Sequence, residues 1–208
     1  YVGEWVAIVV ADNPYIAEDA LELIDVDYEP LDPIMDPEEA FEEKTRLVHP
    51  GHGSNVLYHG HFTWGEVDDD FAAADDTLSF RARWGRSSTV PIETFGALAQ
   101  WDEGTEILDL WASIQMPNFV ELLSSTLRYP LNNVRLHQDV DVGGSYGVKR
   151  GIKHSVLVGY LCRKLRVPVR LIEDRLVNMS SGDAHGPDRI FDTDVAFNKD
   201  GVIKSLKI

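Results

Sequence analysis

The chain has 208 residues, of which 44% are hydrophobic and 26% are charged, and this balance excludes a disordered tail and a coiled-coil rod. Its 19 Lys and Arg residues against 35 Asp and Glu residues give a formal net charge of −16. Because nucleic acids and anionic lipid surfaces are negatively charged, we expect neither nucleic acid nor a membrane as a partner. No apolar run approaches the roughly 18 residues that a transmembrane helix needs.

The N-terminal part is predicted to be a β-α-β unit. Residues 5–10 are continuously apolar and mostly β-branched, which is typical of a strand covered on both faces. Asn13 and Pro14 then predict the start of a helix, because Asn is a favoured N-cap and Pro is favoured in the first turn. Alternation over residues 25–29 predicts a second strand. The segment 36–60 has no clear periodicity and is predicted to be a linker or a long loop.

From about residue 60, the pattern indicates a second unit that is rich in strands. Apolar residues at helical spacing predict helices over residues 119–127 and 152–165. A turn sequence predicts a β-hairpin around Gly104. Period-two alternation or short apolar runs predict the remaining strands at residues 77–83, 96–100, 107–114, 134–142, 169–173, 190–197 and 202–208. Strands at both ends suggest a piece of a longer chain.

A glycine-rich segment, Asp141-Val-Gly-Gly-Ser-Tyr-Gly-Val-Lys149, lies between a predicted strand and the helix predicted at 152–165. Glycine permits positive φ and close backbone approach, and a helix N-terminus favours an anion. The spacing matches neither a P-loop nor a Rossmann fingerprint, so a purely structural turn is an open alternative. The locally basic segment 149–175 favours an anionic ligand in this acidic chain.

Histidine and cysteine give no indication of a metal site held by side chains. His49, His52, His59 and His61 lie near one another in the sequence, but their spacing is not that of a metal-binding motif. The single cysteine, Cys162, excludes a disulfide and a cysteine-ligated cluster within the chain and favours a cytoplasmic location. Because Cys162 lies in an apolar run, we expect a buried structural thiol rather than a nucleophile.

Three blocks carry a resemblance to a known family. The first joins residues 3–11 to 17–29, and the second joins Pro91-Ile-Glu-Thr94 to residues 110–115 and 117–118. The third joins residues 141–149 to 168–175. In this order and spacing, they resemble the molybdenum-containing large subunit of the xanthine dehydrogenase, aldehyde oxidase and carbon monoxide dehydrogenase family. Nearly the whole chain is covered by the resemblance.

The resemblance implies an α+β fold class. Residues 1–45 would be the C-terminal part of an α/β hammerhead domain, in its β-α-β form, and residues 46–60 a linker. Residues 61–208 would be the first subdomain, the N-terminal part, of the molybdopterin-binding domain.

The family's chemistry implies an oxidoreductase that hydroxylates an aldehyde or N-heterocycle carbon with oxygen from water. The implied cofactor is a molybdenum pterin, in the cytosine dinucleotide form. Iron–sulfur clusters and FAD would lie on partner subunits or domains rather than on this chain. The implied partners are therefore those modules and the remainder of the large subunit, in an oligomer.

The same resemblance assigns roles to residues near the glycine-rich segment. Gln115 matches the glutamine that hydrogen-bonds an oxygen ligand of molybdenum, and Arg150 stands where purine oxidisers carry a substrate-binding glutamate. Gly143, Gly144, Ser145, Tyr146 and Gly147 match the cofactor-binding loop, with Tyr146 in the place of the usual phenylalanine. Because a cation replaces the glutamate, Arg150 argues against xanthine and favours a carboxylate, a carbonyl or another electron-rich substrate group.

Other parts of the family's site match nothing in these 208 residues. These parts are a second substrate-side arginine, the general-base glutamate and most of the pterin-binding loops. We therefore expect the chain by itself to be inactive and to bind the cofactor weakly. A non-catalytic scaffold and an anion-binding module of the same fold are the alternatives, and metal analysis distinguishes them from the enzyme.

Overall fold

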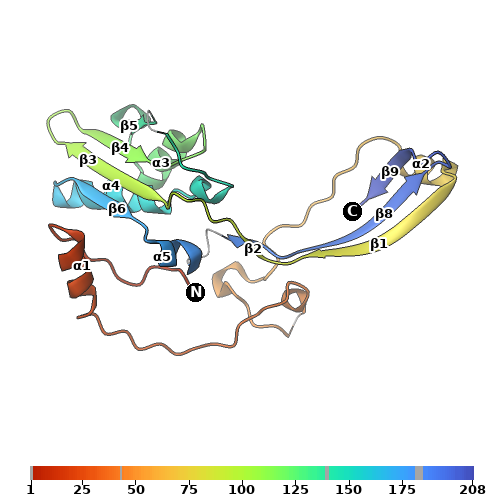
Figure 1. The fold of residues 1–208 in the computed structure, drawn as a ribbon, viewed down its shortest axis with the longest axis horizontal. Coiled ribbons are helices and arrows are strands. Elements are labelled where there is room, and N and C mark those ends of the chain that lie inside the picture. The colour runs from red at the N-terminus through yellow and green to blue at the C-terminus, as the bar shows by residue number, and fades with distance from the viewer. Residues whose placement is uncertain (1, 43, 139–140, 181–184) are drawn as a thin grey trace. The chain divides into compact units, whose positions relative to one another are not determined.

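The computed structural model describes residues 2–42, 44–138, 141–180 and 185–208. The chain divides into two compact units. Tyr1–Asp27 and Ser88–Gly186 make up the four-stranded unit, and Tyr28–Ser87 and Pro187–Ile208 make up the three-stranded unit. The four-stranded and the three-stranded sheet are each combined with helices, so the predicted α+β class is confirmed (Figure 1). In the described part of the chain, no helix is both long and apolar enough to cross a membrane.

The sheet of the four-stranded unit has the order β5-β4-β3-β6. Strand β3 is antiparallel to both β4 and β6, and β5 is parallel to β4. The predicted hairpin around Gly104 is confirmed, since Asp102 of β3 pairs with Ile107 of β4. The strands are β3 (Gly96–Asp102), β4 (Ile107–Ala112), β5 (Val134–His137) and β6 (Val169–Ile172).

Two predicted helices, α3 (Phe119–Leu127) and α4 (Lys153–Leu165), supply the side chains that pack against this sheet. Gly159 of α4 permits the close contact, because a Cβ there would lie 3.3 Å from side-chain carbons of β4 and α3. Cys162 is fully buried, as predicted, and burial raises the pKa of its thiol. The core consists mainly of Ala97, Ala99, Leu108, Leu110, Phe119, Leu123, Val158 and Cys162.

Strand direction brings four loop segments to one edge of the sheet. Because β3 runs opposite to β4, β5 and β6, the residues before β3 and those after the other three strands share that edge. The strand predicted over 134–142 ends at His137, Val140 lies outside the described residues, and Val142 is not in a strand. There the chain leaves the sheet, and the carbonyl of Gly143 instead accepts a hydrogen bond from the N–H of Glu93.

The N-terminal segment contains helix α1 (Pro14–Leu21), as predicted. Asn13 is its N-cap, and its side-chain oxygen accepts a hydrogen bond from the N–H of Ile16 at 3.0 Å. The strands predicted at 5–10 and 25–29 are wrong, and so is the β-α-β unit. A strand needs a neighbour for its backbone hydrogen bonds, and none of the described strands pairs with either segment. Nor is 5–10 covered on both faces, since most of its residues are exposed.

The three-stranded unit has the antiparallel order β1-β8-β9 and confirms three predicted strands. They are β1 (Asp76–Trp84), β8 (Arg189–Phe197) and β9 (Ile203–Lys207). Helix α2 (Val67–Ala73), which was not predicted, lies against β9. Salt bridges on exposed side chains join Arg81 to Glu38, Arg83 to Asp36 and Lys207 to Asp68.

The remaining elements are short. The predicted loop 36–60 contains two 3₁₀ turns, η1 (Glu39–Phe41) and η2 (Pro50–His52), and no strand or α-helix within its described residues. Helix α5 (Arg175–Ser180) was not predicted. The others are η3 (Leu131–Asn133), η4 (Val148–Arg150) and the strand pair β2 (Ser87–Ser88) with β7 (His185–Gly186). The domain bounds at residues 45 and 61 stay a prediction.

Candidate functional site

The glycine loop, as we call residues 141–149, has an unusual backbone. Three residues have positive φ, namely Gly144 (97°), Tyr146 (50°) and Gly147 (99°). This conformation is uncommon for a non-glycine residue, and the Tyr146 side chain is exposed. The hydroxyl oxygen of Ser145 is buried and has no hydrogen-bond partner within the described residues. Such strain and an unsatisfied buried group are features that cluster at functional sites.

Gln115 lies directly against this loop. It follows β4, and its backbone N–H donates a hydrogen bond to the carbonyl of Lys149 at 3.2 Å. Its side-chain Oε1 accepts a hydrogen bond from the N–H of Gly147, also at 3.2 Å. Because the oxygen of the amide is used in this way, the Nε2 group keeps its two N–H donors, and the side chain is exposed. The structure therefore brings together Gln115 and the glycine loop, which are separate features in the sequence.

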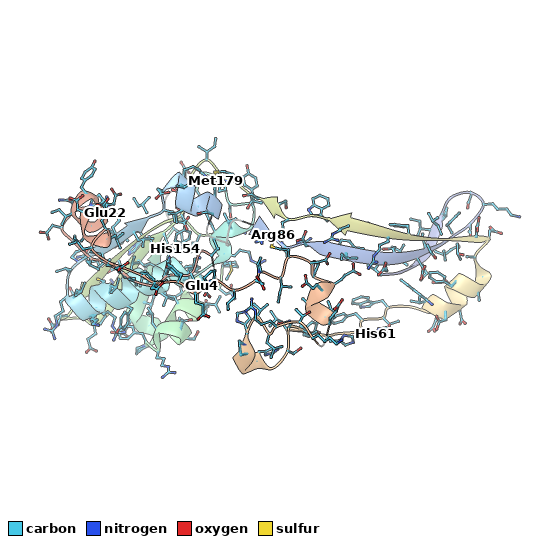
Figure 2. All side chains as sticks on the ribbon, turned by 90° about the horizontal axis from the view of Figure 1, so that it is seen from below. Glu4, Glu22, His61, Arg86, His154 and Met179 are labelled. Atoms are coloured by element: carbon cyan, nitrogen blue, oxygen red, sulfur yellow. The ribbon has the colours of Figure 1, made fainter. Side chains whose placement is uncertain are left out.

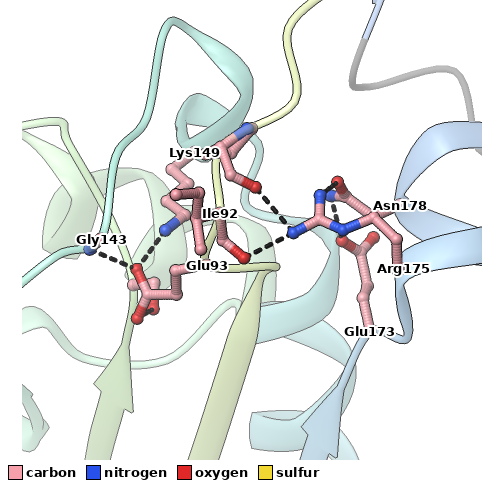
Figure 3. A network of polar contacts seen from close by, with 9 residues as sticks. Ile92, Glu93, Gly143, Lys149, Glu173, Arg175 and Asn178 are labelled. Carbon is pink, nitrogen blue, oxygen red and sulfur yellow. Dashed lines mark hydrogen bonds and ion pairs between the residues drawn. The ribbon is translucent and has the colours of Figure 1, made fainter.

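Glu93, for which the sequence predicted no role, joins three segments at the same edge of the sheet (Figure 3). Its Oε2 accepts hydrogen bonds from the N–H of Gly143, at 2.7 Å, and from Nζ of Lys149. Its Oε1 accepts a hydrogen bond from the hydroxyl of Ser113 at 3.1 Å. A Cβ at Gly143 would lie 2.7 Å from Cβ of Glu93, so only glycine fits this close approach.

The Glu93–Lys149 pair is an ion pair under the loop. Lys149 is fully buried, whereas the Glu93 side chain is 37% exposed. Partial burial alone would raise the pKa of Glu93, but hydrogen bonds from Lys149, Gly143 and Ser113 outweigh it and hold the pKa below its ordinary value. Glu93 is therefore a carboxylate at neutral pH and balances the buried ammonium group.

Arg175 holds the backbone that precedes Glu93. Its guanidinium donates hydrogen bonds to the carbonyls of Pro91, at 2.7 Å, and Ile92, at 2.5 Å. The same group donates to Oδ1 of Asn178 at 2.9 Å (Figure 3). This arrangement fixes the segment before β3 from the opposite side to Lys149.

A second buried pair, Glu173 and His154, lies beside Asn178, which in turn bonds Arg175. Oε2 of Glu173 accepts a hydrogen bond from Nδ2 of Asn178 at 2.9 Å, and Oε1 lies 2.9 Å from Nε2 of His154. His154, labelled in Figure 2, lies near the N-terminus of α4. Its ring stacks on Phe95, with ring centroids 4.6 Å apart. Burial alone would raise the pKa of Glu173, but hydrogen bonds from His154 and Asn178 lower it below its ordinary value. Burial with full hydrogen bonding makes this pair a structural support rather than a solvent-facing acid.

The basic segment 149–175 is used largely within the fold. Lys149 pairs with Glu93, Arg175 binds backbone carbonyls, and Arg163 lies over the ring of Tyr129 at 4.0 Å. These contacts do not form one ligand-facing basic surface. Glu93 and Arg175 both lie in the blocks that carry the family resemblance, and this is the sequence signal that marks them. Hydrophobic periodicity does not identify their hydrogen-bond partners.

Arg150 differs from its neighbour Lys149. Its side chain is exposed, and it has no hydrogen bond or ion pair with the rest of the described chain.

A cavity of about 340 Å³ lies beside Gln115. It is lined by Ala112, Ile114, Gln115, Met116, Pro117, Gln138 and Val142. Gln115 therefore lines a cavity in which its side chain could contact a ligand.

The described residues contain no group of three or more His, Cys, Asp or Glu side chains that could hold a metal ion.

The sequence of residues 48–208 matches the family described as molybdopterin cofactor-binding domain. The chain belongs to this family. The membership confirms the family inferred from the three blocks, and the chain is similar to carbon monoxide dehydrogenase large chains and to xanthine dehydrogenases.

Individual relatives agree with this membership. The 6-hydroxypseudooxynicotine dehydrogenase complex subunit gamma of Paenarthrobacter nicotinovorans is 34% identical over 208 residues, which is 100% of this chain and 26% of that protein. The carbon monoxide dehydrogenase large chain of Afipia carboxidovorans is 32% identical over 226 residues, covering 100% of this chain and 27% of that one. Both relatives are parts of larger enzymes, and this chain spans about a quarter of their length.

The fold comparison gives the same result. The crystal structure of quinoline 2-oxidoreductase from Pseudomonas putida 86 is similar with a TM-score of 0.75 and 33% sequence identity. The similarity covers 94% of this chain and 25% of that one. The mixed α+β fold therefore matches part of a molybdenum hydroxylase. The individual roles of Gln115, Arg150 and the glycine-loop residues stay predictions.

Proposed function

We propose that this molybdopterin-binding chain is part of an enzyme that hydroxylates an aldehyde or N-heterocycle carbon with oxygen from water. Family membership supports the cofactor class. The observation that carries the proposal is the hydrogen bond from Gly147 to Oε1 of Gln115. This bond orients the exposed amide and leaves its Nε2 donors for an oxygen atom of a ligand.

The residues at the sheet edge fit a molybdenum pterin. The metal of such a group is bound by the pterin's own sulfur atoms, so the protein needs hydrogen-bond donors and close backbone rather than ligand side chains. Gln115 offers an amide, and the positive-φ residues of the glycine loop bring main chain to the surface. When bound, the group supplies a two-electron acceptor. Gly143, Gly144, Ser145, Tyr146 and Gly147 would line its site. The main-chain N–H groups that would face it are those of Gly144, Ser145 and Tyr146, because those of Gly143 and Gly147 bond Glu93 and Gln115.

The finer parts of the proposal follow from the family. The cofactor would be the cytosine dinucleotide form, and electrons would leave through iron–sulfur and FAD modules on partner subunits. The remainder of the large subunit would supply the base and complete the pocket, in a cytoplasmic oligomer. Residues 1–45 would belong to a hammerhead domain that precedes the molybdopterin-binding domain. The chain by itself would be inactive.

Substitution of Gln115 tests the proposed role directly. In the full-length subunit within its complex, Gln115→Ala should lower kcat about 10²–10³-fold, as is typical when one aligned donor is lost from a reacting centre. The molybdenum content should be unchanged. The matched control is Gln100→Ala, at an exposed position of β3. Near-normal turnover of the Gln115 variant would contradict the proposed role.

Arg150 is proposed to act on the substrate rather than on the cofactor. Its exposed guanidinium follows the glycine loop and has no partner within the described chain. Arg150→Glu should therefore raise KM for a carboxylate- or carbonyl-bearing substrate, by about tenfold for one lost charged hydrogen bond. Loss of molybdenum in this variant would instead show that Arg150 holds the cofactor.

The proposal competes with a non-catalytic scaffold and an anion-binding module. The internal use of Lys149 and Arg175 weighs against the anion-binding module. Mass-spectrometric metal analysis of the purified complex, combined with an activity scan over aldehydes and N-heterocycles, distinguishes the remaining two. Stoichiometric molybdenum with turnover supports the hydroxylase, and a metal-free, stably folded complex supports the scaffold.

A further inference from the structure

We propose that Glu93 and Lys149 are positioning residues that hold the glycine loop in the geometry at which Gly147 orients the amide of Gln115. The inference goes beyond the proposed function, on which it rests for the role of Gln115. Neither Glu93 nor Lys149 is proposed to touch the substrate or the cofactor.

The first argument is the number of segments that one carboxylate joins. Glu93 lies before β3, and its oxygens accept hydrogen bonds from the start of the glycine loop, from its end and from the residue after β4. The donors are Gly143, Lys149 and Ser113. The backbone N–H of Glu93 also donates to the carbonyl of Gly143 at 3.3 Å. Both ends of the loop are therefore held by one residue from another part of the chain.

The second argument is the burial of Lys149. A lysine is rarely fully buried unless it is paired, because removal of its charge from water is costly. Here Nζ of Lys149 bonds the same carboxylate oxygen that accepts the N–H of Gly143. An apolar side chain could fill the space, but it could not fix the direction of that carboxylate. The charge pair therefore fills the space and also fixes the direction in which the Glu93 carboxylate accepts the N–H of Gly143.

The third argument is the short path from this pair to Gln115. The carbonyl of Lys149 accepts the backbone N–H of Gln115, and Gly147, two residues earlier, donates to the side chain of Gln115. Movement of Lys149 would therefore move both contacts of Gln115. Arg175 fixes the opposite side through the carbonyls of Pro91 and Ile92.

The test uses the full-length subunit in its complex and three variants: Glu93→Gln, Lys149→Met and the double variant. Glu93→Gln keeps the shape of the side chain and removes its charge, and Lys149→Met keeps the length and removes the charge. Hydrogen–deuterium exchange of the peptide that contains the glycine loop measures its order without any need for turnover. We expect exchange at Gly143 and Gly147 to rise about tenfold or more in each variant, because local opening becomes easier.

Kinetics separate positioning from simple destabilisation. Each single variant should lose about 10–100-fold in kcat, as is usual when a partner that orients a contacting residue is removed. KM should change less than about threefold. The double variant should be no slower than the worse single variant, because both changes break the same link. Additive losses would show that the two residues act independently and would overturn the proposal.

Matched controls are available on exposed surfaces of the same unit. Glu103, which pairs with Arg166, is exposed, and so is Lys164 at the end of α4. Glu103→Gln and Lys164→Met should leave both the loop exchange and kcat unchanged. Should Glu93→Gln not fold, Ser113→Ala removes one donor to the same carboxylate and retains the ion pair. Its loop exchange should rise about threefold, as for the loss of one modest hydrogen bond.

The outcomes also distinguish this inference from the proposed function. Unchanged loop exchange in folded Glu93→Gln, or in Ser113→Ala, overturns the positioning role whatever the enzyme catalyses. Absence of molybdenum and turnover in the unaltered complex overturns the proposed function. In that case, a rise in loop exchange would still support the hold of Glu93 and Lys149 on the loop.

Discussion

The two units contain ion pairs of the same chemistry in opposite surroundings. In the four-stranded unit, Lys149 is fully buried against Glu93, whereas in the three-stranded unit the side chains of Arg81 and Glu38 are each 53% exposed. Water screens the exposed pair, and such pairs typically contribute about 0–1 kcal/mol. Breaking a buried pair leaves an uncompensated charge and is far more costly. The position of a charge, rather than the net charge of the chain, therefore decides what it does.

The apolar side chains differ in the same way. In the four-stranded unit, Phe119 and Leu123 are fully buried between a helix and the sheet. In the three-stranded unit, Phe80 and Leu78 of β1 are 46% and 54% exposed. Burial of apolar surface is the main stabilising contribution, so the four-stranded unit should dominate the stability of the chain. Matched substitutions in the two units of the 208-residue chain should therefore differ in cost.

The largest effect is expected at Phe119. Phe119→Ala should lower the free energy of unfolding by about 3–5 kcal/mol, because it removes a fully buried ring and leaves a cavity. Phe80→Ala, at a half-exposed position, should cost less than half as much. Urea denaturation followed by circular dichroism measures both values. Equal losses would refute the contrast between the two units.

The next largest effect is expected at Glu173. Glu173→Ala should cost about 3 kcal/mol, because it leaves buried His154 and Asn178 without their carboxylate partner. The matched change in the three-stranded unit is Glu38→Ala, which removes an exposed ion pair and should cost less than about 1 kcal/mol. A large loss in the Glu38 variant, measured by the same denaturation, would show that its ion pair is not screened.

Stability should depend on acidic pH through Glu93 and Glu173. The folded-state pKa of each lies below the ordinary value of 4.5, so each adds stability above that pH. The contribution is lost as the pH falls from about 4.5 through the folded-state pKa. Urea denaturation between pH 7 and pH 3 should show this decline, and Glu173→Gln should make it shallower. An unchanged slope in that variant would contradict the assignment.

The smallest effect is expected at the start of α1, which belongs to the four-stranded unit but contains no buried residue. Asn13→Ala removes the side-chain acceptor for the N–H of Ile16 and should cost about 1 kcal/mol of local helix stability. Amide exchange within residues 14–21 should become about fivefold faster, whereas exchange in α3 should stay unchanged. Equal acceleration in α3 would show that α1 unfolds together with the core.

Much of the local structure could be predicted from sequence. The N-cap of α1, the apolar stripe of α3 and the turn at Gly104 are each signals within a few neighbouring residues, and local backbone preference decides them. The same holds for the glycine loop, because closely spaced glycines by themselves indicate positive φ. Three motif blocks in register were enough to predict the family.

Only the tertiary structure decided which segments pair. The apolar run at 5–10 has the composition of a strand, but a strand forms only against a neighbour, and the described strands provide none. Glu93 and Lys149 are 56 residues apart, and they meet because the directions of β3, β4 and β5 bring their loops to one edge of the sheet. Periodicity reports which face of an element is apolar, but the partner of a buried charge depends on strand order and direction.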